Sequence, residues 1–238
     1  MSRQLFISDL HLDPARPAVI AALAEFLEKN TDCHALYILG DIFEAWVGVD
    51  DDSPLASEIA ALLRAFTSQG PELYLMVGNR DFLLGEDFCA SVGATLLPDP
   101  TPIDLYGRPT LLLHGDSLCT ADAEYMKFRA MARSPEWQAQ LLASSLEDRR
   151  ALAAQLRAAS KDASSNKAED IMDVTPSEVG RVMEEANVSL MIHGHTHRPA
   201  RHPVTRGERI VLGDWDSKGW YIEASPNKIE LIEFNINQ

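Results

Sequence analysis

Histidines, aspartates and one asparagine stand in five short clusters along this 238-residue chain. Imidazole nitrogens, carboxylates and an amide oxygen together form a donor set that suits Mn²⁺, Fe²⁺ or Zn²⁺. The clusters contain no cysteine, so a purely thiolate site for a soft metal ion is excluded. The clusters are Asp9-Leu10-His11, Gly40-Asp41, Gly78-Asn79-Arg80-Asp81, His114-Gly115-Asp116 and His193-Gly194-His195-Thr196-His197.

Each cluster taken alone gives weak support for a metal site. An Asp-x-His segment after a strand is more often a turn, and a lone His114 is more often a hydrogen-bonded core histidine. The pair His195 and His197 is stronger, because alternate side chains of an extended segment project to the same side. Five clusters in one chain together predict a two-metal centre. Ions roughly 3.5–4 Å apart need a bridging carboxylate, for which Asp41 is the natural candidate, and a hydroxide between them can attack phosphorus in line.

Alternating strand and helix signals surround the first three clusters. Apolar runs at residues 4–8, 35–39 and 73–77 predict strands. Amphipathic spacing at residues 17–29 and 54–68 predicts helices, as does the short segment 86–92. This βαβαβ order predicts an α/β fold with a parallel sheet that is covered on both faces. Sites in such sheets form at the carboxyl ends of the strands, which is where the clusters fall.

A different pattern follows residue 100. The sequence predicts a hairpin at 102–114, a helix at 175–187, and strands at 189–192, 209–212, 220–224 and 228–234. Residues 121–170 between them are helical and polar. We interpret residues 121–170 as a helical cap that is inserted within a single domain of residues 1–238.

Composition limits the location and the partners. The formal charge is −15, whereas nucleic-acid-binding proteins normally present a basic face, so we expect no nucleic-acid partner. We expect a cytoplasmic protein, since the chain shows no spanning segment or signal peptide, and its three scattered cysteines indicate reduced thiols. The cap holds eight basic and eight acidic residues, so the body carries the whole negative charge.

The order D-x-H, G-D, G-N, H and G-H-x-H resembles the calcineurin-like metallophosphoesterase superfamily, over almost the whole chain. The resemblance implies a two-sheet sandwich flanked by helices (α/β/β/α). It implies one metal held by Asp9, His11, Asp41 and His197. It implies a second metal held by Asp41, Asn79, His114 and His195.

Arg80 departs from the pattern that is common in this superfamily, which has histidine at that position. The histidine is usually assigned to stabilising the transition state or to protonating the leaving group. Arginine cannot act as a general acid near neutral pH, but it can bind phosphate oxygens through its planar fork of donors. A phosphate monoester that leaves from a diphosphate needs no proton. Arg80 therefore favours diphosphate hydrolysis over the cleavage of ordinary phosphate esters.

The Gly-Asn-Arg-Asp variant, the 121–170 insertion and residues 114–120 resemble one family within the superfamily, the UDP-2,3-diacylglucosamine pyrophosphohydrolases of lipid A biosynthesis. This resemblance implies hydrolysis to 2,3-diacylglucosamine 1-phosphate and UMP, with water attacking the phosphorus nearer uridine. It also implies two Mn²⁺ ions per chain and catalytic roles for Arg80, Asn79 and Asp41. The implied substrate contacts are Asn79, Arg80, Asp122, Ser160, Ser164, Lys167 and His195.

An acylated substrate needs an apolar chamber beside the metals. The resemblance implies peripheral binding at the cytoplasmic face of the bacterial inner membrane, with no obligate protein partner. Residues available for the chamber wall, or simply for packing the cap onto the body, are Tyr125, Met126, Phe128, Met131, Leu141, Leu142, Leu152, Leu156, Trp46, Phe82 and Leu83. The last two favour a place at the site because they follow Arg80. Basic residues that either meet anionic lipid or lie on a solvated helix face are Arg149, Arg150, Arg157 and Lys161.

Two other functions fit parts of this pattern. A broad-specificity nucleotide diphosphatase of the same superfamily would use the metals without an acyl chamber. A non-catalytic scaffold, such as the retromer subunit of this superfamily, would keep the fold and lose the metals. The apolar cap and Arg80 weigh against the first alternative, and the intact ligand residues weigh against the second.

Overall fold

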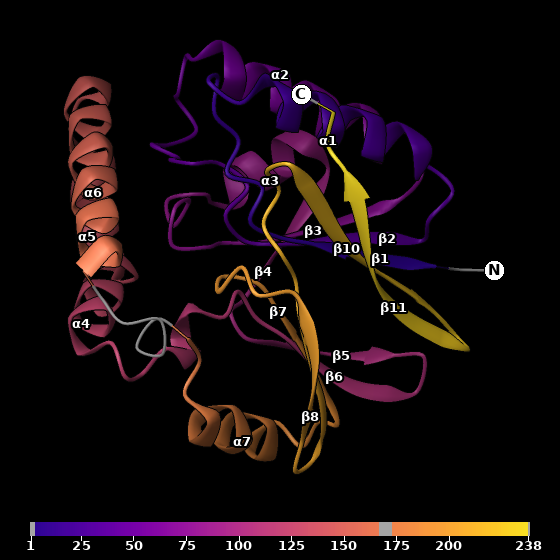
Figure 1. Ribbon diagram of the computed structural model, residues 1–238. Helices are drawn as coiled ribbons and strands as arrows, with labels where there is room; N and C mark the ends of the chain where they lie inside the picture. The colour runs from indigo at the N-terminus through magenta and orange to yellow at the C-terminus, as the bar shows by residue number, and fades with distance from the viewer. Residues whose placement is uncertain (1–2, 167–172, 238) are drawn as a thin grey trace.

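The first of two sheets holds the strands that precede three of the clusters. The computed structural model describes residues 3–166 and 173–237, without the side chains of 161–166, and this sheet has the strand order β11-β10-β1-β2-β3-β4 (Figure 1). The parallel strands are β1 (Gln4–Ile7), β2 (Ala35–Leu39), β3 (Glu72–Met76) and β4 (Ala94–Leu97). The antiparallel strands are β10 (Lys218–Ser225) and β11 (Lys228–Asn235).

Alternate side chains of the central strands separate two apolar cores. Leu5 and Ile7 of β1 pack in a core with three helices that cover the outer face of this sheet. Phe6 between them points into a second core, together with Tyr37 and Leu39 of β2. Strands buried on both faces read as continuous apolar runs, which is why β2 is recognisable in the sequence. The covering helices are α1 (Pro17–Lys29), α2 (Pro54–Thr67) and α3 (Glu86–Val92).

The second sheet closes the inner core from the other side. Its order is β5-β6-β7-β9-β8, and helix α7 (Pro176–Glu185) covers its outer face through a third apolar cluster (Figure 1). The predicted sandwich of two sheets flanked by helices is therefore confirmed. The strands are β5 (Thr101–Leu105), β6 (Arg108–Leu112), β7 (Leu190–His193), β8 (Ala200–Val204) and β9 (Gly207–Val211).

Two edge strands were not predicted from the sequence. Strand β4 is short and only partly buried, and β8 contains Pro203 and alternates with exposed polar residues. Edge strands tolerate proline and polar side chains because one side of the backbone needs no partner. The turn of the predicted hairpin lies at Tyr106 and Gly107, which both have positive φ.

Three helices stand beside both layers rather than on a sheet face (Figure 1). They are α4 (Ala123–Ala132), α5 (Pro135–Leu142) and α6 (Leu146–Asn166), and we call them the cap helices. Among the described part of the chain, no helix is long and apolar enough to cross a membrane. Within residues 146–160 of α6, the one buried side chain is that of Arg149. Helix α6 is therefore fixed to the body at this point by a charged group instead of an apolar one.

The contacts of Arg149 and Arg150 change the interpretation of the basic residues of the cap. Nη1 of Arg149 donates to the carbonyl of Val47 at 2.5 Å, and its guanidinium also grips both carboxylate oxygens of Asp50, at 2.7 and 2.5 Å. Arg150 pairs with the next two aspartates of the same loop. Neither alternative, lipid contact or a solvated helix face, holds for Arg149, which is buried, whereas Arg150 is exposed and paired with the body. Lys161 has a side chain outside the described residues.

Replacing Arg149 by methionine should loosen the start of α6. The change leaves the buried Val47 carbonyl without its donor, which costs about 1–3 kcal/mol. We expect a matching loss in the free energy of unfolding in urea and faster amide exchange at the start of α6. The control Arg150→Gln removes an exposed charge of the same loop contact and should change stability by less than about 0.5 kcal/mol. Equal effects of the two variants would show that burial of Arg149 is not what holds α6.

Candidate metal centre and substrate cavity

The five predicted clusters meet at one edge of the sandwich. They follow β1, β2 and β3 of the first sheet and β6 and β7 of the second, so the carboxyl ends of both sheets face a common space. Ligand residues there adopt a left-handed backbone that side chains other than glycine rarely tolerate. Their φ angles are 56° at Asp9, 47° at His11, 54° at Asp41, 67° at His195 and 53° at His197. Such outliers cluster at functional sites, because ordinary packing gives no reason to keep them.

One group of side chains forms the first predicted metal position. Nε2 of His11 and Nε2 of His197 lie 3.2 Å apart. Oδ1 of Asp9 is 3.5 Å from Nε2 of His197 and 4.0 Å from Nε2 of His11. Oδ2 of Asp41 lies 3.8 Å from Nε2 of His11. These are the separations expected for donor atoms that share one ion at ligand distances of about 2.0–2.2 Å.

A second group lies on the other side of Asp41. Oδ1 of Asn79 is 3.0 Å from Nε2 of His114 and 2.9 Å from Nδ1 of His195. Oδ1 of Asp41 is 3.8 Å from Nε2 of His114. The two oxygens of Asp41 thus face different groups, as a bridging carboxylate requires.

The donor atoms are presented in the state that a cation needs. Both Ser8 and the backbone N–H of His195 donate to Oδ2 of Asp9, while the buried Oδ1 has no hydrogen-bond partner among the described residues. Nδ1 of His114 lies 2.9 Å from the carbonyl of Leu39, to which it can only donate, so in the neutral imidazole the lone pair is on Nε2, toward the site. A buried carboxylate oxygen without a hydrogen-bond donor can serve as a cation ligand, and the residues present therefore fit a divalent metal.

The pKa values of the two histidines in the second group are shifted in opposite directions. Burial disfavours a charged His114, but the charges of Asp41, Asp9 and Asp116 outweigh it and raise the pKa of His114 to about 9. Burial and the neighbouring His114 lower the pKa of His195 to about 4. A metal ion that binds Nε2 of His114 would therefore displace a proton.

A buried carboxylate that we did not assign a role holds the backbone of this site. Asp81 accepts from the N–H groups of Gly78 at 2.6 Å, Ile42 at 2.7 Å and Asp41 at 3.3 Å. Burial first, and then the charge of Asp41, raise the pKa of Asp81 to about 6. A Cβ on Gly78 would collide with Oδ1 of Asp41, so glycine is required at this approach. The sequence signal for Asp81 was present, since it ends the Gly-Asn-Arg-Asp cluster.

Two further carboxylates stand behind the histidines of the first group. Oδ2 of Asp214 lies 3.6 Å from Nδ1 of His197, and Oε2 of Glu44 lies 3.3 Å from Nδ1 of His11. Carboxylates in this position fix the orientation of a ligating imidazole and raise its basicity. Neither residue belongs to a recognisable motif, because the contact depends on loops that are far apart in the sequence.

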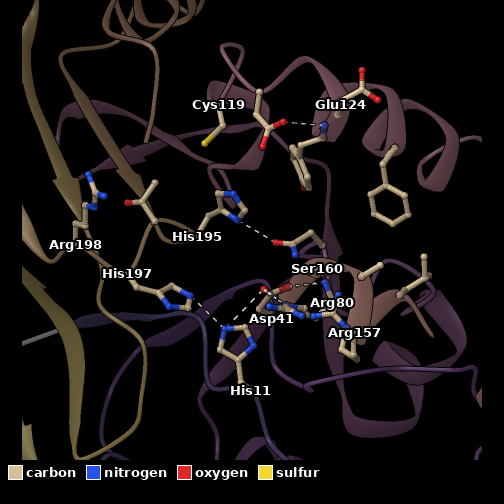
Figure 2. Close-up of a pocket in the computed structure, with 17 residues that line it drawn as sticks. His11, Asp41, Arg80, Cys119, Glu124, Arg157, Ser160, His195, His197 and Arg198 are labelled. Atoms are coloured by element: carbon tan, nitrogen blue, oxygen red, sulfur yellow. Dashed lines mark hydrogen bonds and ion pairs between the residues drawn. The ribbon is translucent and has the colours of Figure 1, made fainter. Parts of the chain in front are cut away.

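A cavity of about 500 Å³ opens over both groups (Figure 2). Of the predicted substrate contacts, it is lined by Asn79, Arg80, Asp122, Ser160 and His195. Arg80 lines this cavity, and its backbone N–H donates to Oδ1 of Asp41 at 2.8 Å. The side chain of Ser164 and the whole of Lys167 lie outside the described residues.

The apolar wall of the cavity comes from the cap helices. Tyr125 and Phe128 of α4 and Leu156 of α6 line it. Phe82 packs against Phe128 with ring centroids 6.5 Å apart and is half-buried next to this wall. The expectation that Leu83 lies at the site is wrong, because it is buried in the outer core. Trp46, for which the sequence left packing open, is buried in the same core against Phe88 of α3.

Four buried or half-buried charges join α4 to the second metal position. Oδ2 of Asp116 accepts from the hydroxyl of Tyr125 at 2.7 Å and from Nε of Arg129 at 2.9 Å. Arg129 also binds Asp99, and Arg133 lies 3.7 Å from Asp116. The ring of Tyr125, held in this way, lies against His195 with centroids 5.8 Å apart. The sequence placed Asp116 beside a ligand but gave no sign of its partners.

Comparison with known proteins agrees with this geometry at the level of class. The family model of the calcineurin-like phosphoesterases matches residues 2–199. A structure titled as a novel archaeal phosphodiesterase superposes with a TM-score of 0.51 over 98% of this chain and 99% of its own, at 13% identity. A hypothetical protein from Pyrococcus horikoshii gives 0.53 over 100% and 90%, at 12% identity. At such identities the likeness concerns the fold alone.

Curated relatives identify one family within this class. A UDP-2,3-diacylglucosamine hydrolase of Cellvibrio japonicus is 58% identical over 98% of this chain and 99% of its own length. A protein of the same name from Pseudomonas aeruginosa is 51% identical over 94% and 95%. The chain belongs to the calcineurin-like phosphoesterases and, within them, to the family of UDP-2,3-diacylglucosamine hydrolases.

Replacing Asp81 by asparagine should destabilise the fold and weaken metal binding together. The amide keeps the shape of the side chain but loses the charge that three N–H donors share, at a cost of about 2–3 kcal/mol. Urea unfolding and the metal content of the purified protein measure the two effects. Asp87→Asn is the control, since Asp87 is exposed on α3 and should change neither quantity appreciably. Full metal content with unchanged stability would refute this role.

Proposed function

We propose that this chain hydrolyses the diphosphate bond of UDP-2,3-diacylglucosamine, giving 2,3-diacylglucosamine 1-phosphate and UMP. The observation that carries the proposal is one cavity that joins the clustered metal donors to an apolar wall of Tyr125, Phe128 and Leu156. A soluble nucleotide would need the donors but not the wall. The name shared by relatives at 58% and 51% identity supports the same substrate.

We propose that the site binds two divalent cations, of which Mn²⁺ is the expected one. Asp9, His11, Asp41 and His197 would hold one ion, and Asp41, Asn79, His114 and His195 the other. When bound, the ions supply a water molecule of lowered pKa and positive charge for the phosphate oxygens. The donor set of imidazoles, carboxylates and one amide supports Mn²⁺ over Mg²⁺, which prefers oxygen donors alone.

Side chains of the protein would bind the diphosphate and the sugar. Arg80 faces the cavity between the metal donors and Glu44, whose Oε1 lies 3.6 Å from Nη1 of Arg80. A guanidinium held there can grip two oxygens of the diphosphate and stabilise the charge that grows on them. Because the leaving group is itself a phosphate, no side chain needs to donate a proton to it. Ser160 and Asp122 line the side where the sugar would lie.

We also propose that residues 121–170 act as a cap over the acyl chains and that the protein works at the cytoplasmic face of the inner membrane. The chemical support is the substrate, whose acyl chains keep it in a lipid layer. Met131 and Leu142 of the cap helices are large apolar side chains that stay exposed, at 43% and 44%.

Hydrolysis in ¹⁸O water tests the reaction. The Mn²⁺-loaded protein should place the label in UMP, prefer the diacylated substrate over its deacylated analogue, and turn over a nitrophenyl phosphodiester slowly. The preference arises because the apolar wall contributes binding only to acyl chains. Comparable rates on all three compounds would favour a broad-specificity diphosphatase instead.

The variant Arg80→Ala should lose about 10²–10³-fold in kcat, the range expected for removing one donor to a developing charge. Its metal content should equal that of the unmodified protein, since the guanidinium of Arg80 lies near Asp41 and Glu44 but offers no ligand atom. Elemental analysis and steady-state kinetics measure both. Loss of metal in this variant would mean that Arg80 has been assigned the wrong role.

The variant Asn79→Ala should bind about one metal ion where the unmodified protein binds about two, because Asn79 contributes to one group of donors alone. Titration with Mn²⁺ followed by elemental analysis gives the stoichiometry. His34→Gln is the matched control, since His34 lies far from the site beside Glu72 on the surface. A stoichiometry of about one in the unmodified protein would exclude the two-metal site, and metal-free protein under all conditions would favour the scaffold alternative.

A further inference from the structure

A second cavity, of about 220 Å³, adjoins the first beside the loop that carries His195 and His197. Thr196 and Arg198 line both cavities, so the two meet at these residues. In Figure 2, Arg198 lies on the opposite side of the histidines from Ser160 of α6. The second cavity is therefore reached from the metal donors in the direction that leads away from the cap helices.

The wall of this second cavity combines charged side chains with the apolar Pro199, Ala200 and Val211. Arg198 donates to Asp173 at 2.8 Å, and Arg209 presents its half-buried guanidinium while its Nη1 donates to Nε2 of His193 at 3.1 Å. Burial and the charge of Arg209 lower the pKa of His202, so this side chain is neutral near pH 7. In a chain of net charge −15, a cavity with two arginines and one aspartate is locally cationic.

Thr196 marks the junction of the two cavities. Its hydroxyl is buried and has no hydrogen-bond partner within the described residues. A ligand atom that reaches this hydroxyl makes a hydrogen bond that the described residues leave unmade. Thr196 lines both cavities, at the place where a molecule extending from the metal donors into the second cavity would pass.

The proposed substrate carries acyl chains at one end and a nucleoside at the other. The inference that follows rests on the proposed function. Its acyl chains match the wall of Tyr125, Phe128 and Leu156, which leaves the nucleoside for the other direction. The geometry points to the second cavity as the subsite for uridine. Uracil offers two carbonyl acceptors to the donors of Arg198, Arg209 and Thr196. Its N3–H, or a ribose hydroxyl, can donate to Asp173.

Calorimetric titration of UMP into the Mn²⁺-loaded protein tests this subsite without turnover. Ribose 5-phosphate is the comparison ligand, because it offers the same phosphate to the metals and lacks the base. UMP should bind the unmodified protein at least tenfold more tightly. Two variants act in different ways: Ala200→Leu fills the cavity, and Arg198→Gln removes a cationic donor. Each should weaken UMP binding about tenfold, equivalent to about 1.4 kcal/mol, and leave ribose 5-phosphate binding within about twofold.

Arg201→Gln is the matched control. Like Arg198→Gln, it replaces an arginine by glutamine, and Arg201 follows Ala200 in β8. Arg201 faces the exposed side, however, where it pairs with Glu208 at 2.8 Å. UMP binding should be unchanged in this variant. Equal affinity of the unmodified protein for UMP and ribose 5-phosphate would overturn the subsite. So would normal UMP binding in Ala200→Leu and Arg198→Gln when both are folded and metal-loaded.

Failure of the subsite can be told from failure of the proposed reaction. If the unmodified protein hydrolyses UDP-2,3-diacylglucosamine while the variants bind UMP normally, the uridine lies elsewhere and the function stands. If the unmodified protein binds UMP through this cavity but does not hydrolyse the acylated substrate, the uridine subsite stands and the substrate assignment falls.

Discussion

The ends of β1 and β2 are tied to each other by backbone hydrogen bonds, and the segments that carry Asp9, His11 and Asp41 depend on that tie. The N–H of Asp9 donates to the carbonyl of Gly40, and the N–H of His11 to that of Asp41. These bonds hold three ligand residues in left-handed conformations, each of which costs about 1–2 kcal/mol. The buried apolar strands supply the stability that offsets this strain, and Asp81 extends the same restraint to the loop after β3.

The metal ligands could be predicted because their geometry is local to strand ends. A residue just after a buried strand has few positions open to it, and parallel strands bring such residues to one edge. Their partners could not be predicted in the same way. Asp116, Asp214 and Glu44 act through contacts with residues that are distant in the sequence, and a carboxylate gives no sign of whether it is buried. Trp46 and Leu83 show the converse, since adjacency to a ligand did not bring their side chains to the site.

The cavity over the metal donors has an apolar wall and a polar floor that come from different parts of the fold. Its apolar side comes from helices that stand beside the sandwich, whereas its polar floor comes from the sheets themselves. Arg80 belongs to the floor, and its neighbours Asp41 and Glu44 fix where its charge can lie. Changes in the helices can thus alter which lipid is accepted while the geometry that acts on phosphorus is kept. The division also explains why the sequence identified the chemistry more easily than the shape of the substrate.

The contact between Arg149, Asp50 and the loop at Gly48 has a consequence for how related sequences can vary. A Cβ at Gly48 would collide with Nη1 of Arg149, and Asp50 would lose its bidentate partner if Arg149 changed. Arg149 and Asp50 should therefore change together among relatives, although about a hundred residues separate them. Gly48 should stay glycine even where Arg149 changes, because its φ of 136° strains any other residue. Charge counted along a segment is then a poor guide to its surface, because cations of the cap are matched to anions of the body.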